Sequence, residues 1–229
     1  MFFFDPNYLI YMVPAFILMA LTSWYVRSSY SKWSRVPTAS GLTGTQAAQR
    51  LISAGGLYGV RIQGIGGQLT DNYDPRTKVL NLSQGVADSA SVASVAIAAH
   101  ELGHAMQDAQ DYFPLRFRAA LVPAVNIGST LGWIMILAGL FIHIMQLAWL
   151  GVFVFAIGAV FSLATLPVEL DASARAKRLL VESGIIMGEQ ERQGVNTVLN
   201  AAALTYVAAL LTAILQVLYY ANLVGGRRR

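Results

Sequence analysis

Two histidines and a glutamate near the middle of the chain have the types and the spacing of a metal site. The stretch is His100-Glu101-Leu102-Gly103-His104. On a helix, side chains four residues apart lie on one face, so both imidazoles can reach the same ion. Zinc binds histidine nitrogen at about 2.0–2.1 Å, and a glutamate beside the first ligand can take a proton from water at the metal. We therefore predict His100 and His104 as ligands of one Zn²⁺ per chain, and Glu101 as a general base.

A chance match on an ordinary helix is the alternative interpretation of this motif. The chain has only three histidines, and two of them fall in the motif. The apolar run 95–99 precedes it and predicts a buried helix, in which an unliganded cluster of polar side chains would be costly. Residues 86–110 contain no proline, and Asp88 and Ser89 offer capping side chains near the start. These features favour a metal-binding helix.

The composition is that of a membrane protein. The 229 residues are 55% hydrophobic and 12% charged, whereas soluble domains carry about 25% charged residues. There are no cysteines, which excludes disulfides and thiolate ligands. The net charge of +4 is small, and the basic residues flank apolar segments. We expect contact with the lipid bilayer and no nucleic-acid partner.

Four apolar segments are long enough to cross a bilayer whose hydrocarbon core is about 30 Å thick. They cover residues 9–26, 120–144, 148–166 and 204–224. No basic segment precedes the first of them, so we expect a retained helix and not a cleaved signal peptide. The polar parts are 27–118 and 169–203. This pattern predicts a mainly α membrane protein, organised as a single membrane-integrated domain over residues 1–229.

The first polar part mixes helix and strand patterns. Residues 45–52 predict a short helix, 57–69 short strands, 71–75 a turn and 78–83 a further strand. We therefore expect a zincin-like helical metal-site region with a small β-hairpin. An exposed edge on the last strand could bind an extended peptide substrate through its backbone, whereas the alternative is a hairpin that covers the helix and binds nothing. The candidate edge residues are Lys78, Val79, Leu80, Asn81 and Leu82.

A catalytic zinc site needs a third protein ligand. Since cysteine is absent, a carboxylate is expected, and Glu169 is the strongest candidate because it follows Pro167 at the border of the third apolar segment. A carboxylate there is costly unless it is paired or bound to a metal. The alternative is that Glu169 caps the N-terminus of a helix over 169–182. Asp171 points to another side of that helix and needs a different partner.

Several other residues are candidates for supporting roles. Asp108 lies one turn after His104 and either orients a ligand or is merely solvated. Tyr206, Arg175 and Tyr73 are candidate oxyanion partners, although Tyr206 also suits an interfacial anchor. His143 is expected to be an interfacial residue near the turn between the second and third apolar segments.

The positions of lysine and arginine predict the orientation in the membrane. With four spans, most of them lie on the same side as the motif helix and residues 169–203, which the positive-inside rule assigns to the cytoplasm. Arg227 to Arg229 at the C-terminus disagree. The residues that agree are Arg27, Lys32, Arg35, Arg116, Arg118, Arg175, Lys177 and Arg178.

The chain resembles the bacterial YugP-like neutral zinc metallopeptidases. The resemblance extends over nearly the whole length and is carried by the segments 69–75, 82–83, 100–105, 167–173 and 201–208. A more distant resemblance is to the CAAX-prenyl and heat-shock membrane endopeptidases, in which a membrane hairpin separates the His-Glu-x-x-His helix from a Glu-x-x-Ala-Asp helix. That likeness implies Glu169 as the third ligand, and Ser173 stands where that pattern has aspartate.

Together, motif and resemblance predict a membrane-bound zinc endopeptidase of the bacterial inner membrane that hydrolyses peptide bonds of a protein or peptide substrate. Glu101 would be the general base for water activated by the metal. Two alternatives remain: a catalytically silent zinc-binding membrane protein, and a zinc hydrolase that cleaves a non-peptide bond.

Overall fold

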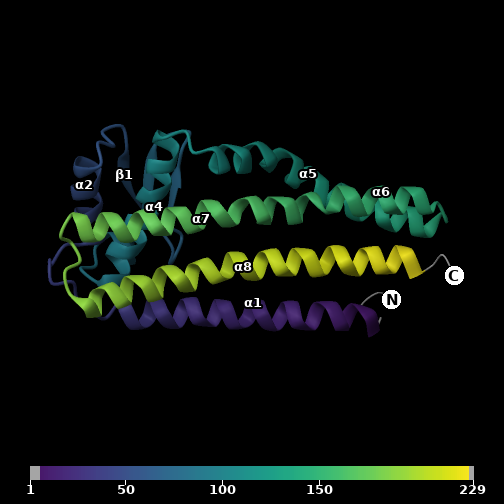
Figure 1. The fold of residues 1–229 in the computed structure, drawn as a ribbon, viewed down its shortest axis with the longest axis horizontal. Helices are drawn as coiled ribbons and strands as arrows, with labels where there is room; N and C mark the ends of the chain where they lie inside the picture. The colour runs from purple at the N-terminus through teal and green to yellow at the C-terminus, as the bar shows by residue number, and fades with distance from the viewer. Residues whose placement is uncertain (1–5, 227–229) are drawn as a thin grey trace. The chain divides into compact units, whose positions relative to one another are not determined.

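The computed structural model describes residues 6–226 as eight helices and three short strands (Figure 1). The strands are β1 (Arg61–Ile65), β2 (Asn72–Asp74) and β3 (Val79–Ser83). The helices in the described residues are α1 (Pro6–Trp33), α2 (Gly44–Ala54), α3 (Gln84–Ala87), α4 (Val92–Ala109), α5 (Phe113–Phe141), α6 (Met145–Phe155), α7 (Ile157–Glu182) and α8 (Glu189–Gly225). Arg227 to Arg229 lie outside the described residues.

The chain divides into two compact units. The first, which we call the membrane unit, contains residues 6–23, Arg116–Pro167 and 205–226. The second, which we call the polar unit, contains Trp24–Leu115 and Val168–Leu204. The motif helix α4 and Glu169 both belong to the polar unit.

Four long apolar helical segments confirm the prediction of a mainly α membrane protein. They are Pro6–Trp33, Phe113–Phe141, Met145–Glu182 and Glu189–Gly225. In the membrane unit α1 and α8 run side by side (Figure 1), and the Tyr8 and Tyr219 rings meet edge to face at 5.3 Å. Helix α7 passes through Pro167, so the separate helix expected from Glu169 onward is wrong; membrane helices accommodate an internal proline.

Close backbone contact joins α5 to α6 in the membrane unit. A Cβ on Gly132 would lie 2.6 Å from the backbone nitrogen of Phe155, and one on Gly139 would lie 2.4 Å from that of Ala148. Small residues at such positions let membrane helices approach closely. His143 lies exposed in the turn between the two helices, where we expected it.

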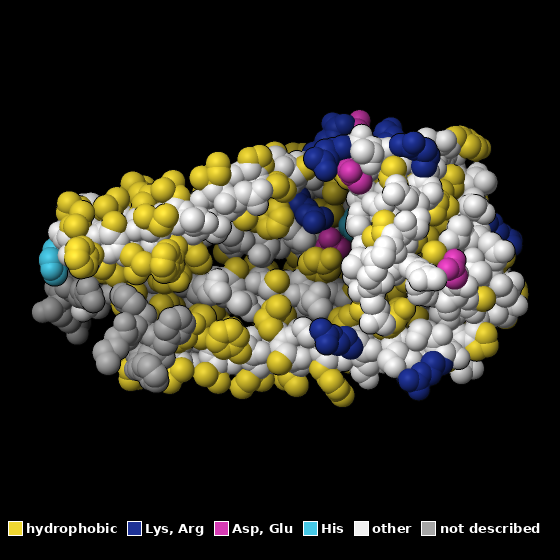
Figure 2. All heavy atoms as spheres, turned by 180° about the vertical axis from the view of Figure 1, so that it is seen from behind, with side chains coloured by type: hydrophobic (Ala, Val, Ile, Leu, Met, Phe, Trp, Pro, Cys, Tyr) yellow, Lys and Arg dark blue, Asp and Glu magenta, His cyan; other side chains and the backbone are white. Residues whose placement is uncertain are grey.

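The surface chemistry differs between the two units. Figure 2 shows apolar side chains covering the membrane unit, while lysine and arginine gather over the polar unit. Large side chains such as Phe16 and Phe153 are 63% and 69% exposed. Because a soluble surface rarely exposes so many large apolar groups together, this surface suits contact with lipid.

The predicted substrate edge at residues 78–82 is wrong. The sheet order is β1-β3-β2, so β3 is the central strand; β1 pairs with it in parallel and β2 antiparallel. Lys78 is not in the strand but in the preceding turn, with φ of 53°. The physical reason lies in the sequence of β3: Val79, Leu80 and Leu82 are all buried, as in strands covered on both faces.

The turn expected over residues 71–75 is wrong for its centre, because Asn72–Asp74 form the edge strand β2. Asp71 precedes the strand, and its carboxylate accepts hydrogen bonds from the backbone nitrogen and the hydroxyl of Ser83 at 2.7 and 3.0 Å. This carboxylate therefore ties the start of β2 to the end of β3. A peptide that adds to this sheet must pair with β1 or β2.

Helix α4 is the buried centre of the polar unit. Ser91 caps its N-terminus by accepting a hydrogen bond from the Ser94 backbone nitrogen at 3.2 Å, so the expected caps Asp88 and Ser89 are wrong. Most side chains from Val92 to Leu102 are buried in the core, together with residues of α2, β3 and the polar part of α8. This packing fixes the helix that carries the histidines.

Candidate metal centre

His100 and His104 lie on one face of α4, as their spacing predicts. Their rings meet edge to face with centroids 4.9 Å apart. His100 is 9% exposed, and His104 is half-buried. The Nε2 atoms of both rings lie close to the same oxygen of Glu169.

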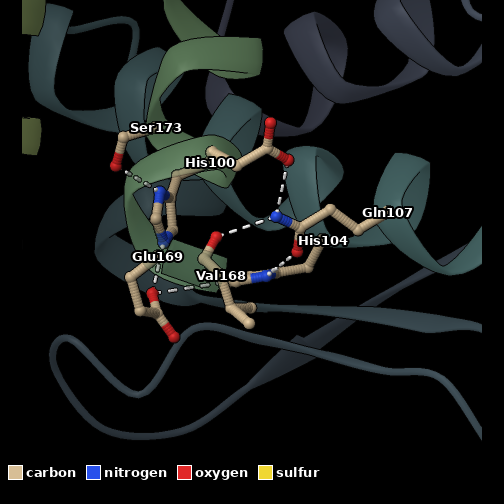
Figure 3. Close-up of polar contacts among 7 residues, drawn as sticks. His100, His104, Gln107, Val168, Glu169 and Ser173 are labelled. Atoms are coloured by element: carbon tan, nitrogen blue, oxygen red, sulfur yellow. Dashed lines mark hydrogen bonds and ion pairs between the residues drawn. The ribbon is translucent and has the colours of Figure 1, made fainter. Parts of the chain in front are cut away.

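Glu169 of α7 completes a cluster of three possible ligands. Its Oε2 lies 3.3 Å from Nε2 of His100 and 3.4 Å from Nε2 of His104, and the carboxylate points toward both rings (Figure 3). The three ligand atoms all lie within 4.8 Å of one another. Glu169 is 2% exposed and sits in the interior of α7, so the alternative of a helix N-terminal cap is wrong.

The second nitrogen of each ring is held by a side chain of the polar unit. Nδ1 of His100 lies 3.2 Å from the Ser173 hydroxyl, and Nδ1 of His104 lies 3.0 Å from Oε1 of Gln107. Outer partners of this kind orient histidine ligands. Two imidazole nitrogens and one carboxylate oxygen are a donor set that fits zinc, and three protein ligands leave a fourth position for water or substrate.

The electrostatics of the motif helix follow from its burial. Burial raises the pKa of Glu101 more than the neighbouring histidines lower it. For His104, burial acts to lower the pKa, but the hydrogen bond with Glu169 and the charge of Glu101 outweigh it and raise the pKa above its usual value. The cluster thus places imidazoles that face negative charge beside a glutamate whose pKa is raised by burial.

Asp108 accepts a hydrogen bond from the Tyr73 hydroxyl at 2.8 Å. The bond fastens β2 to α4, one turn beyond His104. Burial, followed by this hydrogen bond and the charge of Asp108, raises the pKa of Tyr73 well above its usual range. Asp108 was a candidate for orienting a ligand, but the side chain that contacts Nδ1 of His104 is Gln107. Within the described residues, Asp108 instead binds Tyr73.

Arg175 is engaged in contacts within the polar unit. Its Nε donates to Asp171, its Nη1 donates to Gln110, and its guanidinium lies over the Tyr112 ring at 5.6 Å. These contacts supply the partner that Asp171 was expected to need. Tyr206 belongs to the membrane unit. A role in stabilising an oxyanion stays a prediction for Arg175, Tyr73 and Tyr206.

Gln107 is the functional candidate that sequence reasoning missed. It lies three residues after His104, a spacing at which side chains on a helix touch, and that signal was available. Ser173, which the sequence marked only as standing where the related pattern has aspartate, lies one turn after Glu169 and contacts His100. A glutamine carries no charge, so Gln107 does not attract attention in a search for titratable groups.

The comparisons with known proteins identify a zinc metallopeptidase family. A family model described as "Putative neutral zinc metallopeptidase" matches residues 8–225. The chain is 40% identical over 195 residues to the "Putative membrane protease YugP" of Bacillus subtilis (strain 168), which covers 85% of this chain and 86% of that protein. No solved structure matches the chain.

Proposed function

This chain belongs to the family of neutral zinc metallopeptidases, and on that premise we propose that it hydrolyses peptide bonds of protein substrates at the α4–α7 cluster. His100, His104 and Glu169 hold one zinc ion, and Glu101 is the general base. The observation that carries the proposal is the convergence of two histidine nitrogens and one buried carboxylate oxygen within 4.8 Å of one another. Glu101 directly follows the first of these ligands in the sequence.

The chain's own residues supply the proton transfers. When bound, zinc contributes Lewis acidity, which makes water acidic near neutral pH. Glu101 accepts a proton from the water whose oxygen adds to the substrate carbonyl, and it returns that proton to the amine nitrogen as the peptide C–N bond breaks.

Two other functions are less well supported. A silent zinc-binding protein has no need of a glutamate at position 101, and this chain retains one. For a zinc hydrolase that acts on another bond, no feature of the described residues argues in its favour. The Bacillus relative is named as a membrane protease, which favours a peptide bond here.

The proposed setting is the inner membrane of a bacterium, with both units acting as one multi-pass metallopeptidase. Lysine and arginine gather over the polar unit (Figure 2), which by the positive-inside rule supports a cytoplasmic position for the metal centre. The substrate is then a protein that reaches this side of the membrane, and a membrane-associated protein fits best.

The test is metal content and proteolysis of purified wild type, Glu101→Gln and Glu182→Gln. Glu182 is an exposed glutamate on α7 and serves as the control. We expect one zinc per chain in all three. Wild type and Glu182→Gln should cleave an unfolded protein or co-expressed membrane proteins, whereas Glu101→Gln should be slower by about 10²–10⁴-fold.

The outcomes separate the candidate functions. If wild type and Glu101→Gln both hold zinc and neither cleaves any protein, the peptidase proposal fails. Hydrolysis of an ester reporter without cleavage of any peptide would instead support the zinc hydrolase of a different bond.

A further inference from the structure

Gln107 is fully buried between α4 and α7, and its side-chain amide makes three hydrogen bonds. Its Oε1 lies 3.0 Å from Nδ1 of His104. Its Nε2 lies 2.8 Å from the Val168 carbonyl oxygen and 2.8 Å from Oδ2 of Asp171. Figure 3 shows the amide between the His104 ring and the α7 backbone. A buried glutamine that is satisfied on every side is held in one orientation.

The partners of Gln107 settle which way its amide faces. The Val168 carbonyl and the Asp171 carboxylate can only accept hydrogen bonds, so the amide nitrogen must face them. The amide oxygen is then left for His104, and an oxygen can only accept. Nδ1 of His104 must therefore carry a proton. In a neutral imidazole this leaves the lone pair on Nε2, the atom that faces Glu169.

We propose that Gln107 is a positioning residue that selects the metal-binding tautomer of His104 and fixes the direction of its ring. The inference rests on the proposed function, because it takes zinc to be the ion that His104 binds. It assigns to Gln107 a role in metal affinity, through His104 and not through contact with the metal.

Asp171 and Arg175 hold Gln107 in place. Oδ2 of Asp171 accepts from both Gln107 and the Arg175 guanidinium, and Arg175 reaches back to Gln110 at the end of α4. A chain of hydrogen bonds thus runs from His104 through α7 and returns to α4. Asp171 therefore holds the Gln107 amide in place, although it lies 64 residues away from Gln107 in the sequence.

The decisive variant is Gln107→Met, which keeps the length of the side chain and removes all three hydrogen bonds. Zinc affinity is measured by competition with a chelator, and ligand geometry by the visible spectrum of the Co²⁺-loaded protein. We expect zinc affinity to fall about 10–100-fold, the usual effect of removing an outer partner, and the Co²⁺ bands to move. Neither readout depends on proteolysis.

Ser94→Ala is the matched control. Ser94 is a fully buried polar residue on the same helix, and its hydroxyl hydrogen-bonds to Ser91 and to the Gly85 carbonyl, away from the histidines. Its loss should lower thermal stability and leave both metal readouts at wild-type values. Equal loss of zinc affinity in both variants would assign the effect to general destabilisation and overturn the inference.

A second pair of variants keeps the inference testable if Gln107→Met does not fold. Asp171→Ala removes one acceptor from the Gln107 amide and should weaken zinc binding, whereas Asp171→Asn keeps an acceptor oxygen and should restore it. Wild-type zinc affinity in Gln107→Met, or in Asp171→Ala, overturns the role of Gln107 while the peptidase proposal stands. A chain that binds zinc, responds to Gln107→Met and cleaves nothing refutes only the peptidase proposal.

Discussion

The backbone of Gly103 on α4 lies directly against the backbone of Ala172 on α7. A Cβ built on Gly103 would lie 2.5 Å from the carbonyl oxygen of Ala172, closer than real Cβ atoms come. Helix α4 carries the proposed ligands His100 and His104, and helix α7 carries Glu169. The contact of Gly103 with Ala172 therefore sets how close the two helices come at the metal centre. Any side chain at position 103 must therefore separate Glu169 from the histidines.

Gly103→Ala should damage the metal centre and the fold together. Relieving the overlap requires a shift of α4 from α7, and overpacking of this kind costs about 1–3 kcal/mol of unfolding free energy. We expect zinc content well below that of wild type, measured on the purified protein, and a lower midpoint of thermal unfolding.

Gly158→Ala is the matched control for that change. Gly158 is likewise a glycine within a helix, in α7, but a Cβ there meets no atom within 4 Å. Alanine should be neutral or stabilising by about 0.5–1 kcal/mol at such a site. Full zinc content in Gly103→Ala would contradict the idea that helix contact sets the ligand geometry.

Glu169→Gln should abolish most zinc binding. The amide keeps the size of the side chain but removes its negative charge. We expect zinc affinity to fall further than after loss of a residue that only supports a ligand, for which the usual effect is about 10–100-fold. The measurement is chelator competition. Glu191→Gln is the control: Glu191 is also a buried carboxylate, 7% exposed, but it accepts hydrogen bonds from the backbone nitrogens of Ala39, Met187 and Gly188. Zinc retention in Glu169→Gln would exclude Glu169 as a ligand.

Tyr73 should ionise at higher pH than a free tyrosine, whose pKa is about 10. Burial and the bond to Asp108 raise its pKa in the folded state, so the folded protein holds this proton more tightly than the unfolded chain does. The resulting stabilisation is present below about pH 10 and is lost as the pH rises further, toward the raised pKa. Tyrosinate absorbance of wild type minus Tyr73→Phe should therefore develop late in an alkaline titration.

The reference for this titration is Tyr58→Phe, which removes a tyrosine that is 83% exposed. The difference curve for Tyr73 should lie at higher pH than the curve for Tyr58. Coincident curves would mean that the Tyr73–Asp108 bond does not persist in solution.

The sequence predicted the parts of the site that depend on local spacing. His100 and His104 meet on one face because helix geometry brings residues four apart together, and that rule needs no knowledge of the rest of the fold. Glu169 was predicted from a different physical fact, the cost of a carboxylate beside an apolar segment. The four apolar helices followed from length and composition in the same way.

The parts that escaped prediction depend on contacts between distant segments. β3 was expected to be an edge, but β1 arrives from an earlier part of the chain and occupies that edge in parallel register. The orientation of Gln107 depends on Val168 and Asp171, more than 60 residues later. No local pattern encodes such partners, since only the packing of α4 against α7 creates them.

The order of His100, His104 and Glu169 along the chain determines when the metal centre can form during synthesis. Glu169 follows His100 by 69 residues, and the intervening chain includes the apolar helices α5 and α6. At a synthesis rate of about 5–20 residues per second, the ribosome adds the last donor roughly 3–14 s after the first. A nascent chain therefore lacks the complete donor set until α5, α6 and the first half of α7 have been made, so the proposed zinc site cannot form before then.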